Sequence, residues 1–333
     1  MAHNLYIEDG KAHMMYAGEL PWHGLGTQLQ KPATSAQAIK AAGLDWTVRK
    51  VPLFAIEGKG IAHVPKYYGV VPEDRWGKPD CPVFGVVSED YRPLQNAEAF
   101  EFFDSIVGQK VAMYHTAGAL GKGEHVWILA KLPGMMEITN TDVLDKYVLL
   151  STGHDGRTCV RVILTPVRVV CQNTLTMAFN TGEEIARAHH TRNMKRQLAV
   201  ARQDIQALMK GFDGMEATFR QMAKHKLNRQ QAISYIERVF PIPEDTPEEK
   251  VPNWILEDRA NCVHLFHNGL GNNESAIKET LWAAYNGVTE YVDHWRDRGE
   301  REHMYTVCLG KGFQIKARAF SEAVVIAGPA TNN

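Results

Sequence analysis

The 333-residue sequence contains no apolar run near the roughly 18 residues that a membrane-spanning helix requires. Residues 1–5 carry neither the basic segment nor the apolar segment of a secretory signal peptide. We therefore expect a soluble protein that remains in the cytoplasm and has no membrane partner.

Cysteine is scarce and scattered along the chain. The five cysteines include no Cys-x-x-Cys pair, and their number is odd. This pattern argues against a disulfide framework and against a cysteine-rich zinc site. His264 and His267 lie near Cys262 but lack a second group of ligands at a recognised spacing. We predict no metal and no other cofactor, and a metal-dependent enzyme using these histidines is a third hypothesis.

Motifs of nucleotide binding and of common hydrolases are missing as well. The glycine-rich residues 118–123 do not match the Gly-x-x-x-x-Gly-Lys-Ser/Thr pattern of a phosphate-binding loop. Neither Gly-x-Ser-x-Gly nor His-Glu-x-x-His occurs in the chain. The sequence therefore predicts a binding protein and not an enzyme.

What the chain does have is an uneven distribution of charge. The net charge of −1 divides into +8 over residues 157–229 and −7 over residues 230–300. A basic block of this kind favours an anionic partner, because clustered cations attract phosphate polymers and acidic protein surfaces. In the alternative interpretation, the basic and acidic blocks neutralise each other within one fold.

The hydrophobic pattern predicts an α+β fold, in which an antiparallel β-hairpin sheet packs with helices and a mainly helical C-terminal half follows. Asp155-Gly156 is a strong hairpin turn signal, and the glycine-rich residues 117–123 suit a second hairpin. The expected strands are 46–56, 61–71 and 83–87, then 110–116 paired with 125–132, and 147–152 paired with 158–165. A short helix over residues 96–108 precedes the hairpins.

Beyond Pro166 the periodicity becomes helical. The predicted helices are 183–210, 216–226, 229–240, 254–267, 275–295 and 313–327, with a strand at 303–309. The proline-rich, acidic residues 241–247 indicate a boundary. We therefore expect an α+β domain over residues 1–240 and a mainly helical, acidic subdomain over residues 241–333.

The basic block supplies a candidate DNA-binding site. Arg157 and Arg161 lie on one face of a predicted strand whose other face is apolar. The predicted helix that follows carries cations along one side, and the two elements together can form a groove for a sugar-phosphate backbone. The predicted phosphate contacts are Arg157, Arg161, Arg168, Arg187, Arg192, Lys195 and Arg196. Tyr114 and His115, on the first hairpin, are predicted to stack on bases.

Two further features each have two interpretations. Apolar residues from Met194 to Met222 alternate at spacings of four and three, which is typical of a heptad seam. This stripe either faces the core of the chain or forms a subunit contact, and we expect a homo-oligomer that uses it. Trp22, between Pro21 and two glycines, is predicted to be a buried anchor and alternatively a stacking platform.

Four segments resemble a known family. They are residues 1–5 (Met-Ala-His-Asn-Leu), 21–27 (Pro-Trp-His-Gly-Leu-Gly-Thr), 171–175 (Cys-Gln-Asn-Thr-Leu) and 280–294. They resemble phage/plasmid-like proteins, a family classed as a domain of unknown function, over nearly the whole chain. This resemblance implies a mobile genetic element in a bacterial host cell and supplies no reaction.

A second resemblance concerns the order of the elements alone. A helix, two hairpins and a basic helix are similar in order to the core of the single-strand annealing proteins, which form rings with a cationic groove. No site residue is carried over from them. The sequence as a whole predicts a phage-type protein that binds single-stranded DNA and promotes annealing and recombination without nucleotide hydrolysis. The alternative is an interaction protein, an inhibitor or regulator that binds a host protein.

Overall fold

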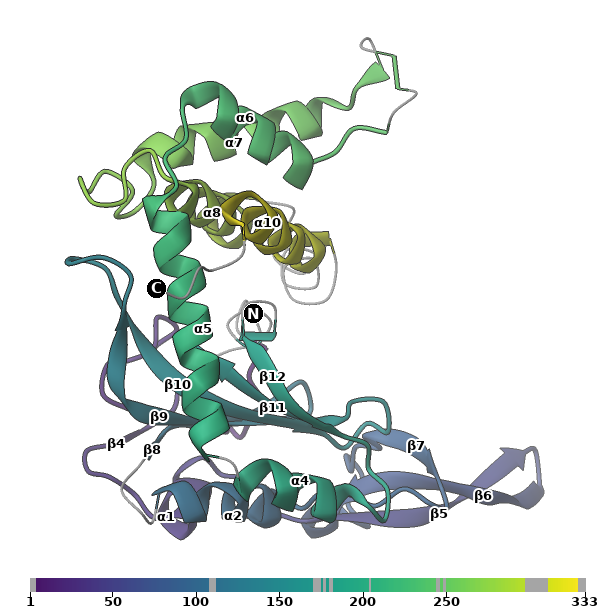
Figure 1. Ribbon diagram of the computed structural model, residues 1–333. Coiled ribbons are helices and arrows are strands. Elements are labelled where there is room, and N and C mark those ends of the chain that lie inside the picture. Colours follow the sequence, from purple (N-terminus) through teal and green to yellow (C-terminus); the bar gives the residue numbers. More distant parts are fainter. Residues whose placement is uncertain are drawn as a thin grey trace.

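The computed structural model describes residues 4–107, 112–169, 175, 178–179, 182–203, 205–243, 246–247, 250–296 and 311–328. A lower body of β-sheets and short helices is joined to an upper layer of helices by the long helix α5, Ile205–Lys224 (Figure 1). The predicted α+β class is confirmed, with helices mainly in the C-terminal half. Over the described residues, no helix is both long and apolar enough to cross a lipid bilayer.

Within the described part of the chain, the largest sheet has seven strands in the order β12-β11-β10-β9-β8-β3-β4. Both predicted hairpins lie at its centre, where β8 pairs with β9 and β10 pairs with β11. β8 extends into the glycine-rich segment that we expected to be a loop, and the turn begins only at Gly121. The strands are β3 Met14–Ala17, β4 Thr27–Leu29, β8 Met113–Leu120, β9 His125–Glu137, β10 Val143–Gly153, β11 Val160–Thr165 and β12 Glu183–Ala188.

Alternation along these strands builds a core on each face of the large sheet. In β11, Val160, Val162 and Leu164 join the main core, whereas Ile163 joins a smaller core on the opposite face. Gly118 of β8 is required for this packing, because a Cβ atom there would lie 2.3 Å from the ring of Trp127. The main core continues through α5 into the upper helical layer.

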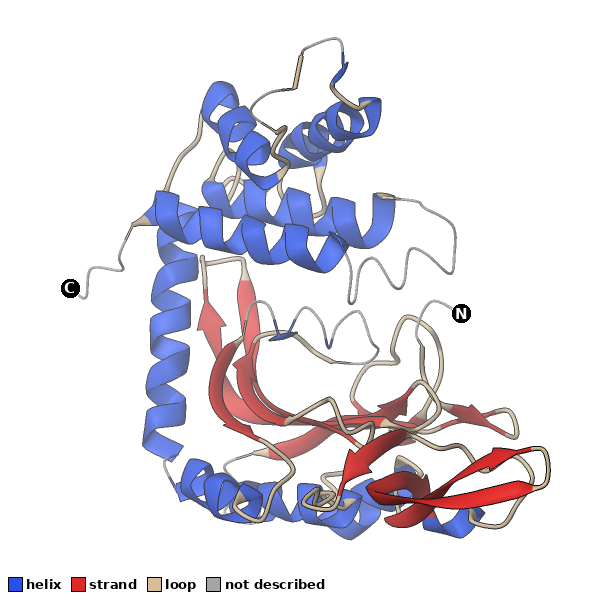
Figure 2. Cartoon of the chain, turned by 90° about the vertical axis from the view of Figure 1, so that its right-hand side faces the viewer, coloured by secondary structure: helices blue, strands red, loops and turns tan. Residues whose placement is uncertain are grey.

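A second sheet contains three antiparallel strands in the described residues, β5 Val48–Glu57, β6 Gly60–Pro72 and β7 Gly85–Ser88. They agree with the first three strands predicted. β5 and β6 continue past β7 as a two-stranded arm that projects from the body (Figures 1 and 2). The small hairpin β1 Ile7–Glu8 with β2 Lys11–Ala12 and the 3-10 turn η1 Glu73–Arg75 complete this end.

The helices form two groups. α1 Ser35–Ala41, α2 Asn96–Val107 and α4 Met194–Gln203 lie along one face of the large sheet (Figure 2). The upper layer contains α6 Arg229–Val239, α7 Asn253–Asn268, α8 Leu281–Glu290, the π-helical turn η3 Tyr291–Trp295 and α10 Lys311–Ala327. Sequence caps explain several starts: the side chain of Asn228 accepts from the backbone of Gln231, and that of Thr280 from Ala283.

The single helix predicted over residues 183–210 is wrong in its first part. Residues 183–188 are the edge strand β12, and helix α4 begins at Met194. The register of β12 shifts by one residue between Ala186 and Glu184, so Ala186 and Ala188 face one side of the sheet, and Glu184 and Arg187 face the other. Hydrophobic periodicity along the sequence does not distinguish so short and irregular a strand from a helix. The helix predicted from residue 275 begins only at Leu281, and the strand predicted at 303–309 lies outside the described residues.

The apolar stripe between Met194 and Met222 belongs to the core of the chain itself. The stripe residues whose side chains are described are all buried there: Met194, Leu198, Phe212, Met215, Phe219 and Met222. The core-facing interpretation is therefore correct for them, and these side chains are not available as a subunit contact. Ala201, Ile205 and Leu208 lie where side chains are not described.

The boundary predicted at residue 240 falls inside the upper helical layer. Helix α6 packs against α7 and α10, which lie on the other side of that boundary. Tyr235 donates a hydrogen bond to the Ala319 carbonyl at 3.0 Å, and Arg238 forms an ion pair with Glu322. The division into residues 1–240 and 241–333 stays a prediction, and these contacts join its two sides.

Trp22 is 63 % exposed, so the prediction of a buried anchor is wrong. Its neighbour Pro21 is the buried residue of the motif. The chain turns back at Gly24, where φ is +70° and the backbone N–H donates to the Pro21 carbonyl. The indole contacts His23 edge-on, with ring centroids 5.3 Å apart, and otherwise remains largely in solvent.

Candidate nucleic-acid interface

The predicted cations do not form one groove, because they divide between the two faces of the large sheet. Arg161 and Arg187 lie opposite Val160 and Ala188, which pack into the main core. Lys195 and Arg196 belong to α4, whose Met194 and Leu198 pack into that same core. The sheet therefore separates the strand cations from the helix cations, and the groove predicted between them is wrong.

Arg161 and Arg187 are cross-strand neighbours that share one carboxylate. Glu184 accepts from Arg161 Nε at 2.5 Å, from Arg187 Nε at 2.8 Å and from Arg187 Nη2 at 3.0 Å. Burial alone would raise the pKa of Glu184, but hydrogen bonds from Arg187 and Arg161 hold that pKa below its usual range. Two arginines thus share a single negative charge, which leaves a positive excess on this face.

The row of cations continues toward the turn between β10 and β11. A cavity of about 250 Å³ there is lined by Arg157, Cys159, Tyr91 and His189 among others. Arg157 and His189 are exposed, and neither forms an ion pair with any described residue. Cys159 and His189, two residues along the chain from Arg161 and Arg187, line this cavity, so the cavity adjoins that pair of arginines. We call Arg157, Arg161, Arg187 and His189 the β11–β12 strip.

The remaining predicted cations have other surroundings. The guanidinium of Arg168 donates to the carbonyls of Ala17 and Glu19, which ties it to the N-terminal segment. Lys195 pairs with Glu98 at 2.5 Å, and this hydrogen bond raises the pKa of the lysine. Arg192, between β12 and α4, and Arg196 are exposed and form no ion pair within the described part of the chain.

The acids that pair with the basic block do not come from the acidic block. Among the described residues, the ion pairs of cations from residues 157–229 involve Glu98, Glu137, Glu184 and Glu216. None of these carboxylates belongs to residues 230–300. Direct pairing of the two blocks is therefore not what balances their charges in this part of the chain.

Tyr114 and His115 are buried, so the prediction that they stack on bases is wrong. The Tyr114 hydroxyl donates to the Phe100 carbonyl at 2.9 Å and lies 3.0 Å from Asp104, and burial raises its pKa. Burial, with the nearby charges of Arg168 and Lys131, lowers the pKa of His115 to about 4. Both residues lie on β8, an inner strand whose two faces are covered, which alternation alone does not reveal.

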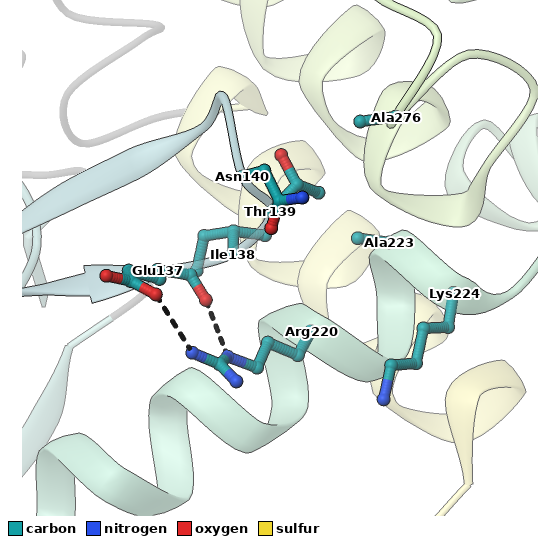
Figure 3. Close-up of a pocket in the computed structure, with 8 residues that line it drawn as sticks. All are labelled: Glu137, Ile138, Thr139, Asn140, Arg220, Ala223, Lys224 and Ala276. Atoms are coloured by element: carbon teal, nitrogen blue, oxygen red, sulfur yellow. Dashed lines mark hydrogen bonds and ion pairs between the residues drawn. The ribbon is translucent and has the colours of Figure 1, made fainter.

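A larger cavity, of about 380 Å³, lies between the end of β9 and helix α5 (Figure 3). Its Arg220 donates to the Glu137 carbonyl at 2.5 Å and pairs with Glu216 at 2.7 Å. Lys224 is the other cation among its lining residues. Because Arg220 is neutralised by its own neighbours, this cavity offers less free positive charge than the β11–β12 strip.

His264 and His267 do not come together with further ligands. His264 lies near Asn268 and the Trp295 ring, and His267 packs against Phe266. Over the residues that the structure describes, no group of three or more His, Cys, Asp or Glu is placed to hold a metal ion.

Sequence reasoning identified three strip residues and missed two features of the site. His189 belongs to the strip because β12 is a strand, and the helical interpretation concealed this placement. Glu184 neutralises part of the positive charge of the strip. Its position three residues before Arg187 could have indicated this ion pair from the sequence.

No curated protein and no solved structure matches the chain. Residues 83–318 match the family described as Domain of unknown function (DUF932). The matched range contains both central hairpins, the β11–β12 strip and most of the upper helical layer. By this match over more than half of its length, the chain belongs to the DUF932 family.

Proposed function

We propose that this protein binds single-stranded DNA through the β11–β12 strip and promotes strand annealing without nucleotide hydrolysis. The observation that carries the proposal is the sharing of Glu184 by Arg161 and Arg187, beside Arg157 and His189, which form no ion pair with any described residue. Cations along a sheet edge can follow the negative charges of a sugar-phosphate backbone. Arg192, in the turn after β12, is a further exposed cation three residues after His189 in the chain.

Binding through phosphates suits annealing for a physical reason. A strand that is held by its backbone keeps its base edges free, and free edges can pair with a complementary strand. The strip contains arginines and a histidine without a base-reading motif, so it favours no particular sequence. The resemblance to phage/plasmid-like proteins, and the order of elements similar to annealing proteins, support a phage-type role in a bacterial cytoplasm.

The test compares two double variants that remove the same charge. Arg157→Ala with Arg187→Ala removes two strip cations, and Arg229→Ala with Lys278→Ala removes two exposed cations of the upper layer. For single strands, log K should fall with log salt by about 0.7 per phosphate contact. The strip variant should therefore flatten the slope by about 1.4, and the control should leave it unchanged. Binding that does not depend on salt, or equal slopes for both variants, would exclude the strip as a phosphate site.

Annealing itself is measured with complementary labelled oligonucleotides in the absence of nucleotide. The unmodified protein should accelerate pairing, and the strip variant should lose this acceleration together with its affinity. Binding without any acceleration would leave a single-strand-binding protein and remove annealing from the proposal.

The projecting β5–β6 arm favours a second candidate function, an interaction protein that binds a host protein. Phe54, Ile56 and Ile61 are 55 %, 72 % and 71 % exposed, and in the cross-strand register they occupy one face of the arm. Clustered exposed apolar side chains are typical of protein contacts, and phosphates gain nothing from them. The arm is also a surface available to the predicted homo-oligomer, which the buried stripe is not.

Light scattering separates these two uses of the arm. If Ile56→Ser with Ile61→Ser reduces the mass of an oligomer, a second copy occupies the arm. If the unmodified protein is a monomer and forms a stoichiometric, nuclease-resistant complex with one host protein, the host-partner function gains support.

A further inference from the structure

The three-stranded sheet lies directly beside the turn that carries Arg157 of the β11–β12 strip. At this turn the chain packs against β7, because a Cβ atom on Gly156 would lie only 2.6 Å from the side chain of Val87. Two further residues of β7, Val86 and Ser88, line the same cavity as Arg157. The surface around Arg157 therefore continues onto β7.

Tyr67 of β6 comes next across this surface. It is the cross-strand partner of Ser88, and neighbouring strands lie about 4.8 Å apart. Directly paired residues share one face of a sheet, and so do residues two apart along a strand. Tyr67, Ser88 and Val86 therefore lie on the same face, and Tyr67 is one strand away from a side chain that lines the cavity of Arg157.

This face of the three-stranded sheet is exposed and apolar. Tyr67, Val83 and Val86 are 53 %, 54 % and 57 % exposed. Val83 lies over Gly69, the partner of Val86, because its Cγ1 atom is 3.3 Å from the position that a Cβ atom of Gly69 would take. Tyr68, the next residue in the chain, points to the opposite face and packs against the core of this sheet. The sheet thus has one packed side and one side that presents an aromatic ring to solvent.

The backbone immediately before Tyr67 is irregular. The register of β5 and β6 shifts between Pro52 and Leu53, which leaves residues 65–67 of β6 without partners on β5. Within this bulge, Lys66 has a φ of +67°, a left-handed conformation that is unfavourable for a residue other than glycine. Bulges redirect the side chains beside them and are frequent next to functional sites. The irregularity therefore favours a binding role for the exposed ring that follows it.

The position of the ring favours a nucleobase as its partner. An exposed apolar face can also contact a protein. Tyr67, however, lies beside Arg157, which forms no ion pair with any residue that the structure describes and can hold a phosphate of the same strand. Proteins that bind single strands without sequence preference combine a cationic surface with aromatic side chains on which the bases stack.

We propose that Tyr67 is a base-stacking residue for the single strand whose phosphates bind the β11–β12 strip, so that β6 and β7 extend the DNA-binding surface to the base of the arm. This inference rests on the proposed function and adds a base contact to its phosphate contacts. Stacking uses the face of a base and leaves the base edge free to pair with a complementary strand. Tyr67 takes the stacking role that the buried Tyr114 and His115 do not have.

Three variants of Tyr67 separate stacking from other contacts. Tyr67→Ala should weaken binding to an oligothymidylate roughly 5- to 150-fold, the effect of losing about one stacked base. Tyr67→Phe keeps the ring and should bind like the unmodified protein, whereas Tyr67→Leu keeps an apolar side chain without the ring and should also lose affinity. The salt slope should stay unchanged in all three variants, because no phosphate contact is removed.

The matched control is Phe54→Ala. It removes an aromatic ring of similar exposure, 55 %, from a part of the arm beyond β7, where Phe54 pairs with His63. This variant should leave the affinity for the oligothymidylate unchanged. A loss of affinity equal to that of Tyr67→Ala would contradict a specific role for Tyr67.

An abasic strand of the same length provides the second measurement. The unmodified protein should bind the oligothymidylate more tightly than the abasic strand, and Tyr67→Ala should lose most of this preference. Salt-dependent binding without such a preference, or with unchanged affinity in Tyr67→Ala, would overturn the stacking role and leave the strip as a phosphate site. If the unmodified protein binds no DNA, the proposed function fails and this inference fails with it. If Tyr67→Ala keeps its DNA affinity but reduces the mass of an oligomer in light scattering, this face is a contact between copies of the chain and not a base platform.

Discussion

Two ion-pair clusters of this protein use the same chemical groups in opposite ways. In the upper layer, Arg296 and Asp258 meet at 2.7 Å with side chains only 5 % and 4 % exposed, and Tyr291 donates to the same carboxylate. At the β11–β12 strip, Arg161, Glu184 and Arg187 are 21 %, 27 % and 54 % exposed. The buried pair matches one positive charge with one negative charge, whereas the cluster of Arg161, Glu184 and Arg187 has two positive charges for one negative charge.

The difference separates structural charge from charge that a ligand can use. A buried ion loses its water, so it depends on its partner and cannot exchange that partner for a ligand. An exposed pair keeps its water and contributes little to stability, so a phosphate can replace the carboxylate at small cost. Each prediction below tests one side of this contrast.

The largest expected effect is at the buried pair. Asp258→Ala leaves the Arg296 guanidinium buried and uncompensated, which should lower the free energy of unfolding by about 3 to 5 kcal/mol. Denaturant unfolding followed by circular dichroism measures it. The double variant Asp258→Ala with Arg296→Met removes both charges and should recover part of the loss. A loss below about 1 kcal/mol in the single variant would show that this pair behaves like an exposed one.

The second effect concerns histidines that are buried as neutral groups. Burial, with the charges of His190 and His125, lowers the pKa of His154 to about 3. In the unfolded chain a histidine has a pKa near 6.5, so below that pH the unfolded state binds the proton first. Stability is therefore complete above pH about 6.5 and falls as the pH decreases toward the folded value, by about 1.4 kcal/mol per pH unit for this residue.

Unfolding of the unmodified protein and of His154→Gln between pH 7 and pH 5 measures this contribution. The variant should lose stability less steeply with decreasing pH, by about 1.4 kcal/mol per unit, whatever its stability at pH 7. His189, which is exposed on the strip, supplies the control variant His189→Gln, in which a histidine is replaced outside the core. Parallel slopes for the unmodified protein and His154→Gln would show that His154 is not buried as a neutral group.

The parts of this fold that could be predicted are those coded locally. Asp155-Gly156 and the alternation around it predict the second hairpin, and β10 and β11 pair as expected. β3 could not be predicted to join the same sheet, because Met15 pairs with Ala117 across a long sequence separation that no local pattern encodes. That strand makes β8 an inner strand, and the two faces of β8 are covered where Phe100 and Phe103 pack on Tyr114 and where Tyr147 packs on His115.

The candidate site was predictable as a set of residues and not as a geometry. Clustered charge singled out Arg157, Arg161 and Arg187; the last two are cross-strand partners, and Arg157 lines the cavity near the β10–β11 turn. The sequence predicted one helix for Arg187, Lys195 and Arg196. Because residues 183–188 are a strand and only residues 194–203 are a helix, Arg187 lies on one side of the sheet, and Lys195 and Arg196 lie on the other. Tyr6, Trp46 and Phe84, from three separate segments, line one cavity of about 260 Å³, which only the folded chain reveals.

The smallest expected effect on stability is at the strip, where Glu184→Gln should change the free energy of unfolding by less than about 1 kcal/mol. The same variant should bind single-stranded DNA more tightly, because an amide no longer neutralises Arg161 and Arg187. If one further phosphate is then bound, the salt slope should steepen by about 0.7. Glu98→Gln is the matched control, since it frees Lys195 of α4 on the opposite side of the sheet. An equal gain in affinity from Glu98→Gln would mean that DNA also contacts the α4 side, and the strip would then be only part of the interface.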